Sequence, residues 1–240
     1  NFNRRDFLKV MGASGAVLLN RNAVSPSALG DILTRNPLIV PGADGLFGIF
    51  EPTAPFTINA RAIEHELLPG KPTRLWTYEI AANGKTYINP VIKIQKNAAF
   101  SPTLSNDLTE PTIIHWHGLH VPARDDGHPA DAIQPAGRYE YDFQILNRAG
   151  TYWYHTHAHE RTAQQVYYGL AGLFIVEDDD EERISKELDL QFGQTDIPLV
   201  IQDRTFTANG DLIYYQNPMG AMDGFLGETI LTNLTYRPYL

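Results

Sequence analysis

Short apolar stretches separated by turn-forming residues fill most of the chain, and this pattern constrains the fold more than any other feature. From residue 39 onward, few stretches follow the 3.6-residue period of a helix. One hairpin turn is expected at Asn83-Gly84, and one helix of a turn or two at residues 159–168. We therefore predict an all-β fold, either a Greek-key β-sandwich or a barrel. The candidate strands are residues 74–80, 91–95, 112–117, 139–145, 150–155 and 172–177.

Composition excludes several classes of function. The 240 residues are 43% hydrophobic, which is enough to bury a full core. There is no cysteine, so disulfides, thiol nucleophiles and any copper site that needs a thiolate ligand are excluded. The net charge is -9, and the acidic run at residues 177–182 supplies six of these negatives, which leaves -3 elsewhere. Nucleic acid is therefore not an expected partner.

The acidic run also divides the chain. We predict a complete sandwich domain at residues 39–178, an acidic, solvated linker at 179–196, and a second strand series from residue 197. Asn209-Gly210 is expected to form a hairpin turn in that second series. Residues 197–240 are too few for a sandwich of about 100 residues. We therefore expect only the first strands of a second domain, and a chain that is part of a longer protein.

The N-terminal segment resembles an export signal. Arg4-Arg5-Asp6-Phe7-Leu8-Lys9 has the form of a twin-arginine motif, and a mild apolar run follows at residues 10–19. Ten apolar residues are too short to cross a bilayer, so no membrane span is expected. We interpret residues 1–30 as a twin-arginine signal peptide, which predicts a periplasmic or secreted protein. The alternative interpretation is a basic amphipathic helix.

Two pairs of histidines carry the chemistry. His115 and His117 form one H-x-H sequence, and His155 and His157 form another. Side chains two residues apart in a strand point the same way, with Cα atoms about 6.5 to 7 Å apart. Each pair closes an apolar strand, so the four rings would meet at one end of the sandwich if those strands are neighbours. Four neutral imidazoles without a thiolate suit copper, zinc or iron.

The remaining histidines are weaker candidates. His159 is expected at the surface or beside the ligands, and His120 and His128 are expected in solvent. Trp116, between the first two histidines, should point into the sandwich as a packing residue.

The motifs around these pairs resemble a known family. H-W-H-G at 115–118, Y-W-Y-H-T-H at 152–157 and G-L-A-G-L-F-I-V-E-D at 169–178 are similar to the first two copper-binding motifs of multicopper oxidases. The likeness is to bacterial laccases of the copper-efflux cuprous-oxidase kind, and it extends from about residue 39 to residue 240. It implies a cupredoxin-like sandwich, with the chain as the N-terminal portion of a copper-dependent oxidoreductase.

The resemblance also implies a role for each residue. His115 resembles the type 2 copper ligand, His117 and His155 resemble ligands of one type 3 copper, and His157 resembles a ligand of the other. Asp126, eleven residues after His115, matches the family's acidic residue that assists proton delivery. Its neighbour Asp125 is the alternative for that role.

The family couples one-electron oxidation of a reducing substrate, a phenol or a metal ion, to reduction of O2 to water. Its type 1 copper needs a cysteine, so that site is absent from this chain. The other half of the trinuclear cluster would come from a missing C-terminal cupredoxin domain. We therefore expect the chain alone to be inactive and to bind copper weakly.

Three alternatives remain open at this stage. The sequence from His115 to His120 superficially resembles the H-x-H-x-D-H motif of binuclear zinc hydrolases, but Leu119 stands where that motif needs aspartate. A second alternative is an exported cupredoxin-like scaffold without enzymatic activity, as in cell-division relatives of the family. Those relatives lack the H-x-H pairs, which are intact here. The third is a split oxidase completed by another polypeptide.

Overall fold

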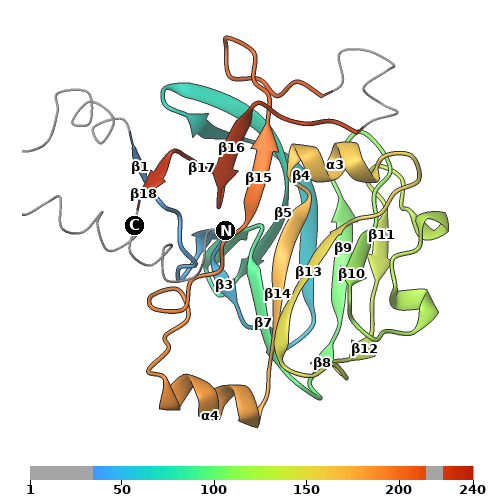
Figure 1. The fold of residues 1–240 in the computed structure, drawn as a ribbon. Helices are drawn as coiled ribbons and strands as arrows, with labels where there is room; N and C mark the ends of the chain where they lie inside the picture. Colours follow the sequence, from blue (N-terminus) through green and yellow to red (C-terminus); the bar gives the residue numbers. More distant parts are fainter. Residues whose placement is uncertain (1–34, 215–223, 240) are drawn as a thin grey trace, which may run out of the picture.

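The computed structural model describes residues 35–214 and 224–239, and the predicted export signal lies outside these ranges. Strands dominate the described residues, and the predicted all-β class is confirmed (Figure 1). Two main sheets face each other as a sandwich, and the sheets do not close into a barrel.

The first main sheet carries both histidine pairs. Its five strands run in the order β10 (Ile114–His117), β13 (Gly150–Thr156), β14 (Ala171–Glu177), β7 (Val91–Gln95) and β3 (Ile49–Phe50). The pairs β10–β13 and β13–β14 are antiparallel, whereas β14–β7 and β3–β7 are parallel. The two histidine strands are therefore direct neighbours at one edge of this sheet.

The second main sheet has six strands, in the order β11 (Arg138–Glu140), β9 (Pro102–Asn106), β4 (Phe56–Leu68), β5 (Lys71–Ala82), β6 (Lys85–Ile88) and β2 (Gly45–Leu46). Asn83 and Gly84 join β5 to β6 with φ angles of 52° and 73°, as the predicted hairpin turn requires. The long strand β4 was not among the predicted strands. Its side chains show no clean alternation of buried and exposed positions, because Ile58 and Ala60 pack in one apolar cluster and Leu67 packs in another.

The core lies between these two sheets. Trp116 from β10 and Tyr154 from β13 are fully buried there, with ring centroids 5.8 Å apart. Trp116 is therefore a packing residue, as expected. Because side chains alternate along a strand, the histidines on either side of Trp116 point away from this core.

One predicted strand is divided in the structure, and the second strand series starts later than expected. Residues 139–145 do not form one strand, because β11 ends at Glu140 and β12 (Phe143–Gln144) pairs with β8 (Ala99–Phe100) in a separate small sheet. The chain changes sheet at Tyr141, whose hydroxyl accepts from Ile114 N and donates to Ile114 O. The second strand series, which was expected from residue 197, begins later, with β15 (Ile201–Arg204).

The C-terminal residues add a small sheet of β15, β16 (Thr229–Thr232) and β17 (Thr235–Tyr236). Strand β1 (Asn36–Pro37) pairs in parallel with β18 (Pro238–Tyr239). A second cluster of buried apolar side chains joins this part to the sandwich: Phe47, Leu67, Leu75, Val91, Ile175, Leu231 and Leu234. Around the expected turn at Asn209-Gly210, Phe206 and Leu212 form an antiparallel bridge. The predicted domain boundaries themselves stay predictions.

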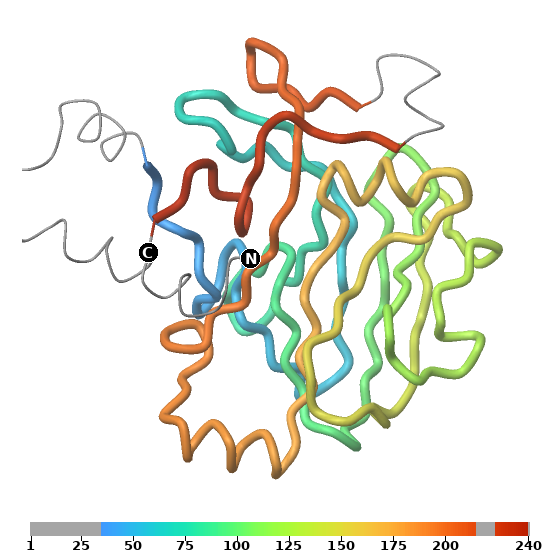
Figure 2. The backbone as a smooth tube through the Cα atoms, in the orientation of Figure 1, coloured from blue at the N-terminus to red at the C-terminus, as the bar shows by residue number. Residues whose placement is uncertain are grey.

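Helices lie at the two ends of the sandwich (Figures 1 and 2). Helix α3 (Thr162–Tyr168) forms within the predicted helical segment. Helix α4 (Asp179–Glu187) was not predicted and occupies half of the segment interpreted as a linker. It forms because the Asp178 carboxylate accepts hydrogen bonds from the backbone of Asp180 and Glu181, and acidic residues favour the first turn of a helix. Within the described ranges, no helix has the length and apolar character that crossing a bilayer requires.

Candidate metal centre

Strand pairing places the two histidine motifs side by side. In the antiparallel register of β10 and β13, His115 lies opposite His155, and His117 lies opposite Trp153. His157 follows the end of β13, where its backbone N–H donates to the carbonyl of Ile113 at 3.0 Å. Both motifs therefore present their rings on the same face of the sheet.

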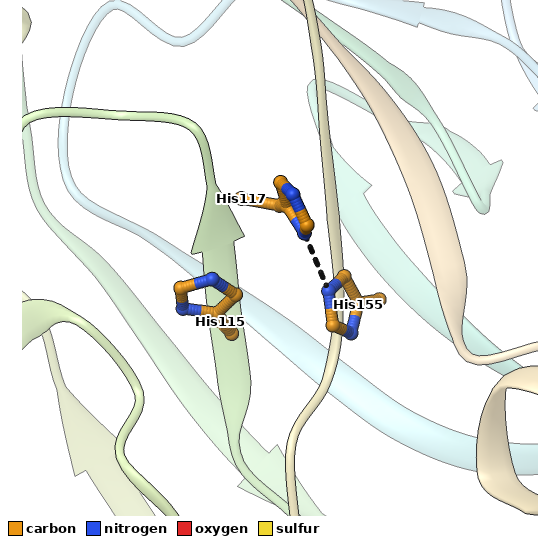
Figure 3. A group of neighbouring side chains, drawn as sticks. All are labelled: His115, His117 and His155. Carbon is orange, nitrogen blue, oxygen red and sulfur yellow. Dashed lines mark hydrogen bonds between the residues drawn. The ribbon is translucent and has the colours of Figure 1, made fainter. Parts of the chain in front are cut away.

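The imidazole rings of His115, His117 and His155 form one group (Figure 3), and the ring of His157 lies beside it. The ring centroid of His115 lies 5.5 Å from that of His117, 5.4 Å from that of His155 and 5.3 Å from that of His157. The rings of His155 and His157 are 6.1 Å apart. The ligand atoms of His115, His117 and His155 all lie within 4.8 Å of one another.

The shortest contact joins the two motifs directly. His117 Nδ1 and His155 Nε2 are 3.1 Å apart (Figure 3). Two nitrogens bound to one metal at about 2.0 to 2.1 Å in tetrahedral geometry would be about 3.3 Å apart. The separation therefore fits a pair of ligands of one ion. The four side chains together can hold one metal ion or neighbouring ions.

Backbone carbonyls set the orientation of two rings. His115 Nδ1 lies 2.6 Å from the carbonyl oxygen of Asp126, and His155 Nδ1 lies 2.7 Å from that of Thr156. If each Nδ1 carries a proton and donates, each Nε2 is left with a lone pair for a metal. His157 Nδ1 is buried with no hydrogen-bond partner. A buried ring nitrogen without a partner is free to act as a ligand.

Burial keeps His155 uncharged. It is only 6% exposed, and loss of hydration lowers its pKa to about 4, with further lowering by the neighbouring histidines. The hydrogen bond to the Thr156 carbonyl acts in the opposite direction. At neutral pH the ring is therefore in the form that binds a metal.

The two aspartates of the following loop have different surroundings. Asp126 Oδ1 lies 3.5 Å from His115 Nδ1, and its side chain is 47% exposed. Asp125 is buried, and its carboxylate accepts from the backbone N–H of Asp142 at 2.9 Å. Of the two, only Asp126 lies both against a cluster histidine and in reach of water.

Gly127 brings this loop against the strand. It has a φ of 75°, and a Cβ there would clash with the carbonyl of Ile114 and lie 2.8 Å from His115 Cα. Only glycine allows so close an approach with this backbone angle. The approach holds the Asp126 carbonyl at the His115 ring.

Trp153 is a member of the group that the sequence interpretation did not single out. Its ring centroid lies 4.2 Å from that of His155 and 5.0 Å from that of His117, with interplanar angles of 30° and 31°. The period of two that places His155 on the outer face also places Trp153 there, so the signal was present in the sequence. His120, His128 and His159 are exposed, as expected, and none of them joins the group.

Comparison with known proteins now gives the family. Residues 63–181 match the family model described as multicopper oxidase. The multicopper oxidase Mco of Staphylococcus aureus is 34% identical over 185 residues, which cover 77% of this chain and 39% of that protein.

The chain belongs to the multicopper oxidase family. The crystal structure of the McoA multicopper oxidase of Aquifex aeolicus superposes on this chain with a TM-score of 0.78 at 46% identity, over 86% of this chain and 43% of that one. The cupredoxin-like sandwich that the resemblance implied is thereby confirmed. Family membership implies copper as the cofactor.

A cell-division protein is also similar to this chain. FtsP of Escherichia coli is 31% identical over 247 residues, which cover all of this chain and 47% of that protein. The chain thus spans less than half the length of each of these relatives.

Proposed function

We propose that this chain is the N-terminal part of a laccase-like multicopper oxidase that couples one-electron oxidation of a substrate to reduction of O2 to water. The chain would supply half of the ligands of a trinuclear copper cluster. The observation that carries the proposal is the convergence of imidazoles from two adjacent strands, with His117 Nδ1 and His155 Nε2 3.1 Å apart.

The residues present fit copper. Neutral imidazoles suit both Cu(I) and Cu(II), so the ligands need not rearrange when the oxidation state changes. The unpartnered, buried Nδ1 of His157 supports a further ligand position beside the other three. Bound copper would supply the one-electron steps and the reduction of O2.

The assignment of ligands to coppers follows the family pattern. His117 and His155 would share one type 3 copper, and their 3.1 Å contact supports this pairing. His157 would bind the other type 3 copper, and His115 the type 2 copper. The carbonyls of Asp126 and Thr156 would hold the His115 and His155 rings in the required tautomer.

Asp126 is the proposed proton-delivery residue. Its partly exposed carboxylate beside His115 can take a proton from solvent and release it towards the cluster face. Asp125, buried and bonded to the backbone of Asp142, would have a structural role instead.

The rest of the oxidase would lie elsewhere. The remaining cluster ligands and the type 1 copper would belong to a C-terminal cupredoxin domain, because this chain has no cysteine. The reducing substrate, a phenol or a metal ion, would bind beside that type 1 copper. The twin-arginine motif at Arg4-Arg5 supports a periplasmic or secreted location.

One other function has a specific observation in its favour. FtsP matches the whole of this chain, so a non-enzymatic exported scaffold is the second candidate. The two candidates differ in what the histidines do. In a scaffold, the histidine cluster would hold no copper, and replacing these histidines would leave the function unchanged.

Copper content and O2 uptake of the purified full-length protein test the proposal. We expect several coppers per molecule, and O2 consumption with a phenol or Cu(I). The variant His157→Asn should lose copper and at least about 100-fold in rate, whereas the exposed neighbour variant His159→Asn should lose neither. Wild-type protein that binds no copper after reconstitution would favour the scaffold.

A further inference from the structure

A glutamine from helix α3 lies beneath the histidine cluster with every hydrogen-bonding position of its amide in use. Gln165 is fully buried. Its Oε1 accepts from the hydroxyls of Thr112, at 3.1 Å, and Thr156. Its Nε2 donates to Glu110 Oε1 at 3.0 Å and to the Pro111 carbonyl at 2.8 Å. Two acceptor and two donor contacts satisfy the amide and fix its orientation.

Thr156 connects this amide to the second histidine pair. It lies between His155 and His157, and its carbonyl holds the His155 ring at 2.7 Å. Its backbone N–H donates to Leu170 O at 3.2 Å, and its hydroxyl lies 3.0 Å from that of Thr112. Every polar group of Thr156 is therefore engaged, and its hydroxyl contacts the side chains of Thr112 and Gln165, with the Tyr78 hydroxyl also beside it.

Thr112 connects the same amide to the first pair. It precedes strand β10, three residues before His115, and is also fully buried. The Gln165 Oε1 atom thus accepts a hydrogen bond from each of the two chain segments that carry the H-x-H motifs. Because Thr156 alternates with His155 and His157 along the chain, this bridge lies on the face opposite the rings.

The other end of the amide is anchored independently of the cluster. Glu110 accepts from Gln165 through one carboxylate oxygen and pairs through the other with Arg161, which directly precedes α3. The side chain of Glu110 is 16% exposed, so the network ends near the surface. The helix is therefore tied to the segment that leads into β10, and the amide cannot shift without breaking the network.

The geometry points to Gln165 as a positioning residue of the metal centre: with Thr112 and Thr156 it forms a clamp that sets the spacing of the two H-x-H pairs. This inference rests on the proposed function. The clamp adds a supporting structure to the proposed copper site, because the separation of His117 Nδ1 and His155 Nε2 depends on the relative position of the two segments that the clamp joins. A metal site is sensitive to shifts of about 0.5 Å in such supporting groups.

The test uses three variants of the full-length protein. Gln165→Leu removes the amide, and Thr156→Val removes one clamp hydroxyl while keeping a β-branched side chain of similar shape. Tyr167→Phe is the matched control on the same helix. Its hydroxyl donates to Ile213 O at 2.7 Å and accepts from Thr205 N at 2.8 Å, away from the histidines.

Copper affinity is measured by competition with a chelator, Cu(II) sites by electron paramagnetic resonance, and stability by urea unfolding. We expect both clamp variants to bind copper about tenfold or more weakly and to show altered Cu(II) spectra. The control should lose stability and keep wild-type affinity and spectra. Equal copper affinity in the clamp variants and the control would overturn the inference, even though wild-type copper binding would still support the proposed function.

A copper-independent measurement keeps the two ideas separate. In a crystal structure of the metal-free Thr156→Val protein, we expect the separation of His117 Nδ1 and His155 Nε2 to depart from 3.1 Å. An unchanged separation would overturn the clamp. If wild-type protein binds no copper, the proposed function fails, and this crystallographic result alone decides whether the clamp exists.

Discussion

His155 is the most buried histidine of the cluster, and its burial makes the stability of the metal-free protein depend on pH. Its pKa falls from the usual 6.5 to about 4, chiefly because burial disfavours the charged ring. Between these values the unfolded chain binds a proton that the folded protein does not. The free energy of unfolding should therefore rise as pH increases from about 4 to about 6.5, and be independent of this residue above that range.

Urea unfolding of metal-free protein across pH 4 to 8 measures this effect. The slope due to one histidine is at most about 1.4 kcal/mol per pH unit. In His155→Gln protein, the free energy of unfolding should rise less steeply between pH 4 and 6.5, with a slope reduced by up to that amount. A pH dependence identical to wild type would show that the ring is not held neutral by the fold.

Variants of Asp126 and Asp125 should differ in which property they change, the free energy of unfolding or the rate of O2 consumption. Asp126→Asn changes a half-exposed carboxylate, so the free energy of unfolding should stay within about 0.5 kcal/mol of wild type. Under the proposed function, the O2 consumption of the full-length protein should fall about 100-fold, because Asp126 would deliver protons.

Asp125→Ala is the matched comparison. It removes the buried carboxylate that accepts from the Asp142 N–H, so about 1 to 3 kcal/mol of stability should be lost. The rate per folded molecule should change little. Rate loss confined to the Asp125 variant would reverse the assignment.

At the scale of elements, the loop after β10 depends on one close approach. Gly127 and Gly84 have nearly the same φ, 75° and 73°, but Gly84 has open space where a Cβ would lie. Both alanine variants incur backbone strain of about 1 to 2 kcal/mol. Gly127→Ala should cost clearly more, because its Cβ would also clash with the Ile114 carbonyl.

Thermal or urea unfolding of the two glycine variants checks this difference. Gly127→Ala should also weaken copper binding, since the loop carries the carbonyl that orients His115. Equal destabilisation of both variants would mean that the loop can move away from β10 without loss.

Across the whole molecule, stability depends on how the C-terminal sheet packs on the sandwich. Leu231 on β16 is fully buried in the second apolar cluster, whereas its neighbour Ile230 is 59% exposed. Leu231→Ala should reduce the free energy of unfolding by about 2 to 5 kcal/mol, and Ile230→Ala by less than about 1 kcal/mol. Chemical denaturation of both variants measures this. Similar small losses would mean that the two parts unfold independently.

The local pattern of apolar and turn-forming residues was sufficient to predict the fold class and most strands of the first main sheet, which carries both histidine pairs. Residues 91–95 form a strand with the predicted bounds, and the turn at Asn83-Gly84 lies where expected, because alternation and turn chemistry are local properties. Helix α4 was missed although Asp178 is a good N-cap, since the acidic run was interpreted only by its charge. Strand β4 was missed because its side chains do not alternate cleanly: Ile58 and Ala60 are buried in one apolar cluster, and Leu67 is buried in the other.

The sequence by itself determined which residues could form a metal centre. The period of two in a strand places His115 with His117, and turns His155 and Trp153 to one face, whatever the rest of the fold. Only the tertiary structure decided that β10 and β13 are neighbours in a register that sets His115 opposite His155. It also decided that Asp126, rather than Asp125, lies at His115, and that Gln165 bridges the two motifs from behind. These contacts join segments far apart in the chain, and their energies arise only when the folded backbone has brought the segments together.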